Sequence, residues 1–577
     1  MKFHATLLVV LLATTSVAAN ERQMQSPIPN GDWYTTYSKY PEYCSTPDMM
    51  AERKIPSVQQ DSRLGETRLV HVTTVIRHGA RTPDVGGYQC WEGYWDNPET
   101  GVWNCDLKTQ MAQPTPVDPD HSEVVLFEKQ YDALLDPDQG LSNGLFGTCQ
   151  TGQLIQRGYD QQIENGRILR DAYCYDADLD VIDHDPRMRL MDVNAQDNKP
   201  WNEPQLHLRS DDDQRVLVSG QTLVRSMFGP EIKEATNKGR QVNIPVHLAD
   251  RDKDVISIRE STCPRLTEIR ENLEKSSIFK RYNNSKEARE IYKFVKKELK
   301  IKGKMSILEC LMTTVCTDRP LPDVLDYEKS DMFDRMASFA YQGFNMHLLA
   351  NNAEYSKLAM APLWAEIMDK INLILNGDKH SPATRLALIS AHDDTVASLM
   401  ATLGIWKDDQ WPPYATMFLI EIHEIIDSRT DHAAFPSKFA FRLVHDGQVL
   451  TQKIKGCLDD AELCDINVFT DLVAGFSSRD RNCKPKRKLS SDSGGGALGP
   501  FYSFLLLLVG SAIGGAGMSY YLTGSIPFWK GNGIGRSSDF SGMSLPPVGY
   551  SDDPAADSAN GFEDDADKNN GGITFLE

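Results

Sequence analysis

Residues 77–83 have the sequence RHGARTP, which places two arginines around one histidine. Planar guanidinium groups match phosphate oxygens through paired hydrogen bonds. Two nearby cations also lower the pKa of an imidazole, which leaves a neutral ring that can act as a nucleophile. Arg77, His78 and Arg81 are therefore candidates for phosphate binding and nucleophilic attack. The alternative is a solvated loop with surface arginines.

A second candidate cluster follows an apolar run at 386–389, where the chain continues Ser-Ala-His392-Asp393-Asp394. We expect a helix to start near Thr395, which would place His392 at the positive end of that helix, where anions bind. Asp393 could donate a proton if a bound phosphate raised its pKa. Helix capping is the alternative role for both acids, and it is the interpretation that we favour for Asp394.

A third cluster contains Arg209, which lies just past two leucines, and Arg215, which follows six residues later. The three acids between them, at 211–213, have no histidine or cysteine beside them. They are therefore more typical of a helix cap than of a metal site, and we expect no metal.

A second His-Asp pair, His445-Asp446, precedes Gly447 between two alternating apolar runs. An Asp-Gly dipeptide in that setting predicts a hairpin turn rather than a catalytic pair.

The elements that must position these residues are strands separated by long helical stretches, which indicates an α/β fold. We predict strands at 69–76, 215–219, 385–390 and 417–422, and helices at 151–173, 265–279, 286–300, 331–349 and 361–375. Open α/β sheets bind ligands beyond the carboxyl ends of their strands, so the first two clusters should meet there. We expect a Rossmann-like central sheet flanked by helices. A smaller, mostly α-helical lobe should be inserted at roughly 225–375, and residues 84–145 should form a long excursion pinned by disulfides.

The motifs at these positions resemble those of the histidine acid phosphatase family. Its signature Arg-His-Gly-x-Arg-x-Pro is matched in full at 77–83, and its later His-Asp pair stands at 392–393. Its Arg-Ser-Thr-Asp-x-x-Arg stretch is represented at 209–215, with Asp211 in place of threonine, and residues 152–173 are similar to its Gly-Gln-Leu helix. The similarity spans about 65–465.

The resemblance implies an acid phosphatase that hydrolyses small phosphomonoesters without a metal or other cofactor. His78 would form a phosphohistidine intermediate and Asp393 would protonate the leaving alcohol. The phosphoryl oxygens would be bound by Arg77, Arg81, Arg209 and His392. One alternative is a lysophosphatidic acid phosphatase with the same chemistry, because residues 399–415 are similar to a run of that branch. Others are a phosphoryl mutase and an inactive, membrane-tethered binding module.

The two ends of the chain predict a single-pass type I membrane protein of the secretory pathway, in a lysosome, an endosome or the cell surface. An apolar run after Met1-Lys2 is typical of a signal peptide, and the uncharged run around 501–522 is long enough to span a membrane. The predicted organisation is a signal peptide at 1–19, a phosphatase domain at 20–483, a flexible stalk at 484–499, a transmembrane helix at 500–523 and a disordered acidic tail at 524–577.

Composition narrows the class of protein further. A formal net charge of −20 argues against nucleic-acid binding. Eleven cysteines suit an oxidising compartment, and the odd count leaves at least one thiol unpaired. Cys457 and Cys464 are close enough to close a small loop. Asn283 is a candidate glycosylation site, and the chain could form a homodimer.

Overall fold

The computed structural model describes residues 33–485 with internal gaps. The gaps are at 60, 85–89, 106–108, 114–124, 130–144, 176–184, 194–198, 241, 302–304, 327, 378–382 and 427–432. Within the part of the chain that is described, no helix is long and apolar enough to cross a membrane. The predicted signal peptide, membrane span and acidic tail lie outside these residues, as does nearly all of the stalk, so all four stay predictions.

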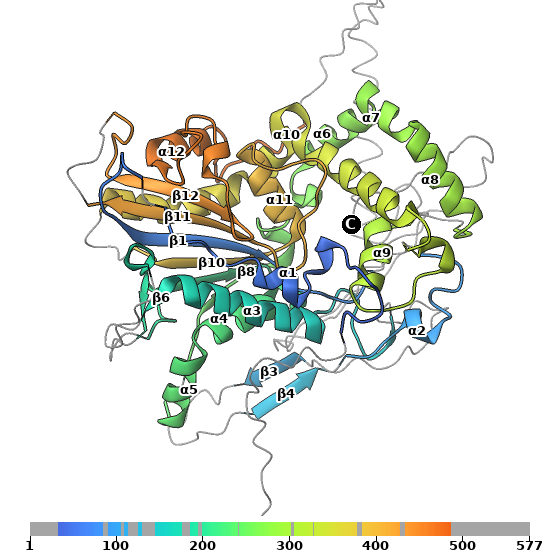
Figure 1. The fold of residues 1–577 in the computed structure, drawn as a ribbon, viewed down its shortest axis with the longest axis horizontal. Coiled ribbons are helices and arrows are strands. Elements are labelled where there is room, and N and C mark those ends of the chain that lie inside the picture. Colours follow the sequence, from blue (N-terminus) through green and yellow to red (C-terminus); the bar gives the residue numbers. More distant parts are fainter. Residues whose placement is uncertain are drawn as a thin grey trace, which may run out of the picture. The chain divides into compact units, whose positions relative to one another are not determined.

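A mixed eight-stranded sheet lies at the centre of the fold (Figure 1). Its strand order is β13 (Gln448–Val449), β12 (Phe439–His445), β11 (Met417–Ile425), β1 (Thr67–Arg77), β10 (Leu386–Ala391), β8 (Leu206–Ser210) and β9 (Val246–His247), with β14 (Cys464–Asp465) paired to β12. Strands β1, β10, β8 and β9 are parallel, and the pairings of β11 to β14 are antiparallel.

The parallel strands β1, β10 and β8 end at the same edge of the sheet. Arg77 pairs with Ala391, and Ser390 pairs with Ser210. The segments that follow these three strands are therefore neighbours, which confirms that the first two sequence clusters meet at the carboxyl ends of strands.

The strands of the sheet carry apolar side chains on both faces, and helices cover both of these faces. Along β11, Met417 and Leu419 belong to one apolar core, whereas Phe418 and Ile420 belong to the other. Helices α3 (Gln156–Tyr173) and α4 (Gln214–Met227) pack on the first face, and α10 (Met332–Asn376), α11 (Asp393–Thr402) and α12 (Ile466–Ala474) pack on the second (Figure 1).

A helix-rich segment is inserted between β9 and β10, as expected. It contains α6 (Pro264–Glu274), α7 (Ser277–Asn283), α8 (Lys286–Lys297), α9 (Ile307–Val315) and α10. The helix predicted at 265–279 is in fact two, because Ser276 caps a new helix by accepting a hydrogen bond from the Phe279 amide. The helices predicted at 331–349 and 361–375 lie in the two halves of α10, which is kinked at 350–353.

The remaining α-helices and strands are short. They are α1 (Pro47–Ala51), α2 (Pro98–Gly101), α5 (Gly229–Asn237), β2 (Val102–Trp103), β3 (Thr109–Gln113), β4 (Val125–Lys129), β5 (Phe146–Gly147), β6 (Cys174–Tyr175) and β7 (Met191–Asp192). Several fall in the predicted excursion at 84–145, where the described residues are pinned by two disulfides, Cys90–Cys310 and Cys105–Cys149.

The strand predicted at 215–219 is wrong, because these residues belong to helix α4. Val216, Leu223 and Met227 recur on the buried face of that helix, and this helical spacing outweighs the local β-branched pattern. The strand of this segment is β8, so Arg209 lies inside a strand and Arg215 lies in the first turn of a helix.

Three further disulfides, Cys44–Cys316, Cys263–Cys483 and Cys457–Cys464, complete the set of five. The predicted Cys457–Cys464 loop is confirmed, and so is the unpaired thiol, which is Cys174.

Candidate active site

Backbone hydrogen bonds join the loop after β1 to its neighbours in space. The His78 amide donates to the Ala391 carbonyl at 3.1 Å, and the Ala415 amide donates to the His78 carbonyl at 3.0 Å. Helix α3 holds the same loop, because Gln161 accepts from the Ala80 amide at 2.8 Å and Gln162 donates to the Arg77 carbonyl at 2.9 Å. The position of His78 is therefore fixed by three separate elements.

Gly79 allows helix α3 to approach the loop closely. A Cβ atom at this position would lie 2.2 Å from the carbonyl oxygen of Gly158 in α3, and a Cβ on Gly158 would lie 2.2 Å from the Ala80 carbonyl oxygen. Both positions exclude any side chain. The glycine of the RHG motif thus fixes the packing of the loop that carries the histidine.

His78 is 1% exposed and is held in one tautomer. Its Nδ1 lies 2.9 Å from the Gly79 carbonyl oxygen, which can only accept, so Nδ1 carries the proton and the Nε2 lone pair is available. Burial, followed by the charges of Arg215, Arg77 and Arg81, holds the pKa of His78 well below its usual value. The ring is therefore neutral at mildly acidic pH and can act as a nucleophile.

Arg77 is fully buried among polar and aromatic partners. Its Nη1 donates to the Pro412 carbonyl at 2.6 Å, and its Nη2 donates to the Tyr43 hydroxyl at 2.6 Å and pairs with Asp393 at 2.7 Å. The rings of Tyr43 and Tyr414 lie 4.6 and 4.5 Å from its guanidinium carbon. These contacts fix the guanidinium in one orientation.

Arg81 is held by a carboxylate that the sequence analysis did not identify. Glu309, on helix α9, accepts from its Nη1 at 2.9 Å and from its Nη2 at 2.5 Å. Glu309 also accepts from the Asp84 amide at 2.8 Å. Both arginines of the motif therefore carry a carboxylate partner, Asp393 or Glu309, on the groups that could bind phosphate oxygens.

Arg209, which is predicted to bind phosphate, is paired with acidic side chains in the structure. Its two Nη atoms donate to the buried carboxylate of Asp254 at 2.9 and 2.6 Å, and its Nε lies 3.6 Å from Glu366. Arg215 instead is the cation with the largest effect on the pKa of His78, and Arg209 is not among the main contributors. Helix α4 contacts the His78 loop, because the Ser219 hydroxyl accepts a hydrogen bond from the Gly79 amide at 3.2 Å. Arg215, which itself pairs with Asp213 at 3.0 Å, is therefore a further candidate phosphate ligand, and the phosphate-binding role of Arg209 stays a prediction.

His392 lies beside His78, with the two ring centroids 5.8 Å apart. Its Nε2 is 2.9 Å from the Oδ2 atom of Asp211, which also accepts from the Ser257 hydroxyl. Burial alone would raise the pKa of Asp211, but the hydrogen bonds from His392 and Ser257 and the charge of Arg259 hold it well below its usual range. The helix-cap interpretation is therefore wrong for Asp211, whose carboxylate orients His392.

Asp393 and Asp394 have opposite electrostatic settings. Burial would raise the pKa of Asp393, but Arg77, together with a hydrogen bond from the Trp411 indole at 3.0 Å, holds it below its usual value. Burial raises the pKa of Asp394 to about 6. His392 occupies the N-cap position of α11, and both acids lie in its first turn, so the capping role favoured for Asp394 is wrong.

A cavity of about 260 Å³ opens next to these groups. Asp393, Asp394, Glu309 and Glu260 contribute acidic groups to its wall. The rest of the lining is Tyr43, Ile258, Ser306, Leu308, Phe344, His347, Leu348, Tyr355 and Trp411. The cavity combines apolar walls with several acids, a setting that suits an uncharged or cationic alcohol better than a polyanion.

The other predicted residues have separate outcomes. Asp446 and Gly447 form the turn between β12 and β13, both with positive φ, so the hairpin interpretation is confirmed. Asn283 is the last residue of α7, where its Oδ1 accepts from the Tyr292 hydroxyl at 3.3 Å. Its glycosylation stays a prediction.

A model of the histidine phosphatase superfamily (branch 2) matches residues 68–446, which is more than half of the chain. The chain belongs to the histidine phosphatase superfamily. The chain is similar to "Counting factor 60" of Dictyostelium discoideum, which is 24% identical over 75% of this chain and 89% of the relative. It is also similar to lysosomal acid phosphatase of Bos taurus, which is 22% identical over 56% of this chain and 70% of the relative.

Among solved structures, the apo form of multiple inositol polyphosphate phosphatase from Bifidobacterium longum aligns with a TM-score of 0.45 and 10% identity, covering 77% of this chain and 98% of that chain. The superfamily membership and the acid phosphatase relatives make this protein a phosphatase.

Proposed function

We propose that this phosphatase hydrolyses phosphate monoesters through a phosphohistidine formed on His78. The observation that carries the proposal is the state of that ring: a neutral imidazole with Nδ1 tied to a carbonyl and Nε2 available, beside Arg77, Arg81 and Arg215. Positive charge at these three positions stabilises the charge on the transferring group's oxygens without a metal ion.

Substrate binding requires an exchange of anions. In the structure Asp393 pairs with Arg77 and Glu309 pairs with Arg81, so a phosphoryl group would take over hydrogen bonds that carboxylates now make. The two arginines are at most 1% exposed, and charge pairing at such buried sites is strong. An incoming phosphate therefore competes with these acids. Arg215 adds a third cation near the nucleophile, and it is itself paired with Asp213 at 3.0 Å.

The exchange also prepares Asp393 as the proton donor. Its pKa is low because of Arg77. A phosphoryl group bound to Arg77 would offset that charge and add a negative charge of its own, so the pKa of Asp393 would rise. The nucleophile His78 then forms an N–P bond as the P–O bond to the alcohol breaks, and Asp393 protonates the leaving oxygen.

The second step reverses these roles. Water attacks phosphorus, the Asp393 carboxylate takes a proton from that water, and the N–P bond to His78 breaks to release inorganic phosphate. His392, whose Nε2 is held by Asp211, donates a hydrogen bond from Nδ1 to a phosphoryl oxygen during both steps when both ring nitrogens carry protons.

The size and the lining of the cavity favour a substrate whose alcohol group is apolar or uncharged. Its volume of about 260 Å³ fits a small aryl or glycerol group, and its acids oppose a multiply phosphorylated alcohol. This favours a simple phosphomonoesterase, and it keeps lysophosphatidic acid as the second candidate substrate, since its single phosphate is attached to an uncharged glycerol ester. The five disulfides support a function in an oxidising compartment of the secretory pathway.

The direct experiment compares purified wild-type protein with His78→Ala on an aryl phosphate, lysophosphatidic acid and inositol hexakisphosphate at about pH 5. We expect the wild type to hydrolyse the first two faster than the third, and the variant to hydrolyse none. Equal rates for wild type and variant would refute the role of His78. A preference for the hexakisphosphate would refute the proposed substrate class.

A further inference from the structure

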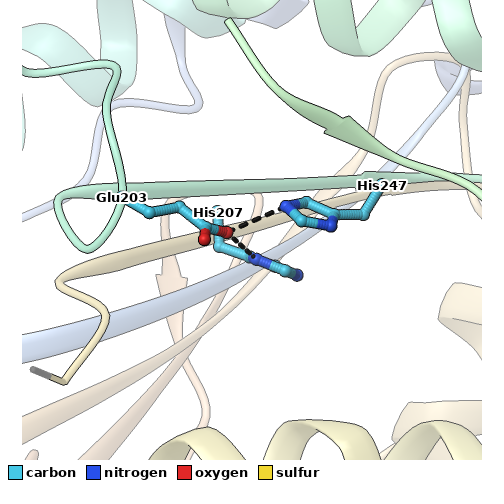
Figure 2. A group of neighbouring side chains, drawn as sticks. All are labelled: Glu203, His207 and His247. Atoms are coloured by element: carbon cyan, nitrogen blue, oxygen red, sulfur yellow. Dashed lines mark hydrogen bonds and ion pairs between the residues drawn. The ribbon is translucent and has the colours of Figure 1, made fainter. Parts of the chain in front are cut away.

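Three side chains of metal-binding type meet at the edge of the sheet, among residues that the proposed mechanism does not use (Figure 2). His207 is on β8, His247 is on the edge strand β9, and Glu203 precedes β8 by three residues. Their nearest ligand atoms all lie within 4.8 Å of one another.

The two histidines converge on a single oxygen atom. His207 Nδ1 lies 2.6 Å and His247 Nε2 lies 2.8 Å from the same Oε1 of Glu203, and the two rings stack with their centroids 4.1 Å apart (Figure 2). Ligands of a tetrahedral zinc ion with bonds of about 2.0–2.2 Å are separated from one another by about 3.3 Å. The distances of 2.6 and 2.8 Å would therefore have to lengthen by roughly 0.5–0.7 Å for an ion to fit between these side chains.

The backbone already holds the three residues together. Strands β8 and β9 are parallel, and His247 pairs with Arg209, two residues beyond His207. Arg209 also bonds Asp254 with both Nη atoms, which anchors the segment after β9 to β8. The ligands would therefore need only rotamer adjustments, without a change of fold.

We propose that Glu203, His207 and His247 bind one zinc ion. Two imidazoles and one carboxylate are a common three-ligand set for Zn²⁺, with water in the fourth position, whereas Mg²⁺ and Ca²⁺ prefer oxygen ligands throughout. The fourth position is reachable from solvent, because the side chains of Glu203 and His247 are 48% and 41% exposed.

By binding His247 on β9 and His207 on β8, the ion would cross-link the two-residue edge strand to its neighbour in the sheet. Lys370 of α10 adds a positive charge that is close enough to interact electrostatically with Glu203 and His207. A simple His-Glu-His hydrogen-bonded group is the competing explanation, and it predicts no metal affinity.

Zinc binding by the full-length protein at about pH 7 decides between the two explanations. Equilibrium dialysis with Zn²⁺ should reveal a site in the wild type that is weakened at least about 100-fold by His207→Gln or by His247→Gln, because loss of a group that only supports a ligand already costs about 10–100-fold. Glu203→Gln keeps the shape of the side chain and should also weaken the site. The matched control Glu234→Gln removes an exposed carboxylate on α5 and should bind zinc as the wild type does.

A second readout uses Co²⁺, whose visible absorption intensifies at four-coordinate sites containing nitrogen ligands. The wild type should give this spectrum and His247→Gln should not, while both hydrolyse an aryl phosphate, which shows that the variant is folded. Wild-type protein without a saturable zinc site overturns the proposal. Unchanged affinity in both histidine variants also overturns it, because the ion would then be bound elsewhere.

Discussion

Arg215 and Arg209 are expected to have different roles, and substitutions at the two positions distinguish a loss of catalysis from a loss of stability. Arg215→Gln removes the cation with the largest effect on His78. Loss of one preorganised donor to a transition-state oxygen typically lowers kcat by about 10²–10³, or about 2.7–4 kcal/mol. Arg209→Gln instead leaves the carboxylate of Asp254, which is 1% exposed, without its bidentate partner. Breaking a buried pair in this way lowers the free energy of unfolding by about 3–5 kcal/mol.

The pH profile adds a second signature for Arg215→Gln. Removing a nearby positive charge raises the pKa of His78, so a larger fraction of the ring is protonated in acid and cannot attack phosphorus. The activity of this variant should therefore fall more steeply than that of the wild type as the pH is lowered from about 7 to about 4. Arg209→Gln should keep the wild-type profile.

The assay is kcat and KM for an aryl phosphate across that pH range, together with urea unfolding of each variant. We expect Arg215→Gln to lose turnover while it keeps most of its stability, and Arg209→Gln to lose stability while its folded fraction turns over normally. The reasoning is refuted if Arg209→Gln is as stable as the wild type but has the larger loss of kcat.

Three further predictions concern the groups around the nucleophile. Glu309→Gln should bind inorganic phosphate roughly tenfold more tightly, a gain of about 1.4 kcal/mol, because Arg81 loses the carboxylate with which phosphate competes; inhibition of aryl phosphate hydrolysis measures this. Asp393→Asn should slow esters of weakly acidic alcohols by about 10²–10⁴, and esters of acidic phenols much less, because only the former need a proton. The neutral, buried His78 should make the free energy of unfolding fall as the pH drops below about 6.5, since the unfolded chain then binds a proton that the folded chain does not; His78→Gln should remove up to about 1.4 kcal/mol per pH unit of that dependence.

Each of these predictions has a control or an opposing outcome. Glu260→Gln alters another acid of the same cavity, one that pairs with Arg270, and should leave phosphate inhibition unchanged. Equal slowing of both classes of ester by Asp393→Asn would show that Asp393 is not the proton donor. Parallel stability profiles for wild type and His78→Gln would show that His78 is protonated in the folded protein.

The sequence was most informative where function depends on short, contiguous motifs. The segment at 77–83 and the pair His392-Asp393 each follow an apolar run, and both runs are parallel strands that end at the same edge of the sheet. Local pattern was enough here because a strand end and the next few residues form one structural unit.

Residues that come together only through tertiary structure were not predicted. Glu309 lies on α9, and Tyr43 precedes Cys44, whose disulfide to Cys316 brings the two segments together. That connectivity cannot be deduced from cysteine spacing. Arg215 was within the third cluster, but the valines after it favoured a strand. Only the buried face of α4 identifies the helix on which Arg215 lies close enough to lower the pKa of His78.

The most direct test of the central claim is to trap the covalent intermediate. Wild-type protein and Asp393→Asn would be mixed with a labelled aryl phosphate, denatured rapidly, and analysed by mass spectrometry for an acid-labile phosphoryl group on the peptide that contains His78. The account predicts phosphorylation of His78 in both proteins and none in His78→Ala. Turnover by the wild type without any phosphohistidine, or label that persists in His78→Ala, would contradict it.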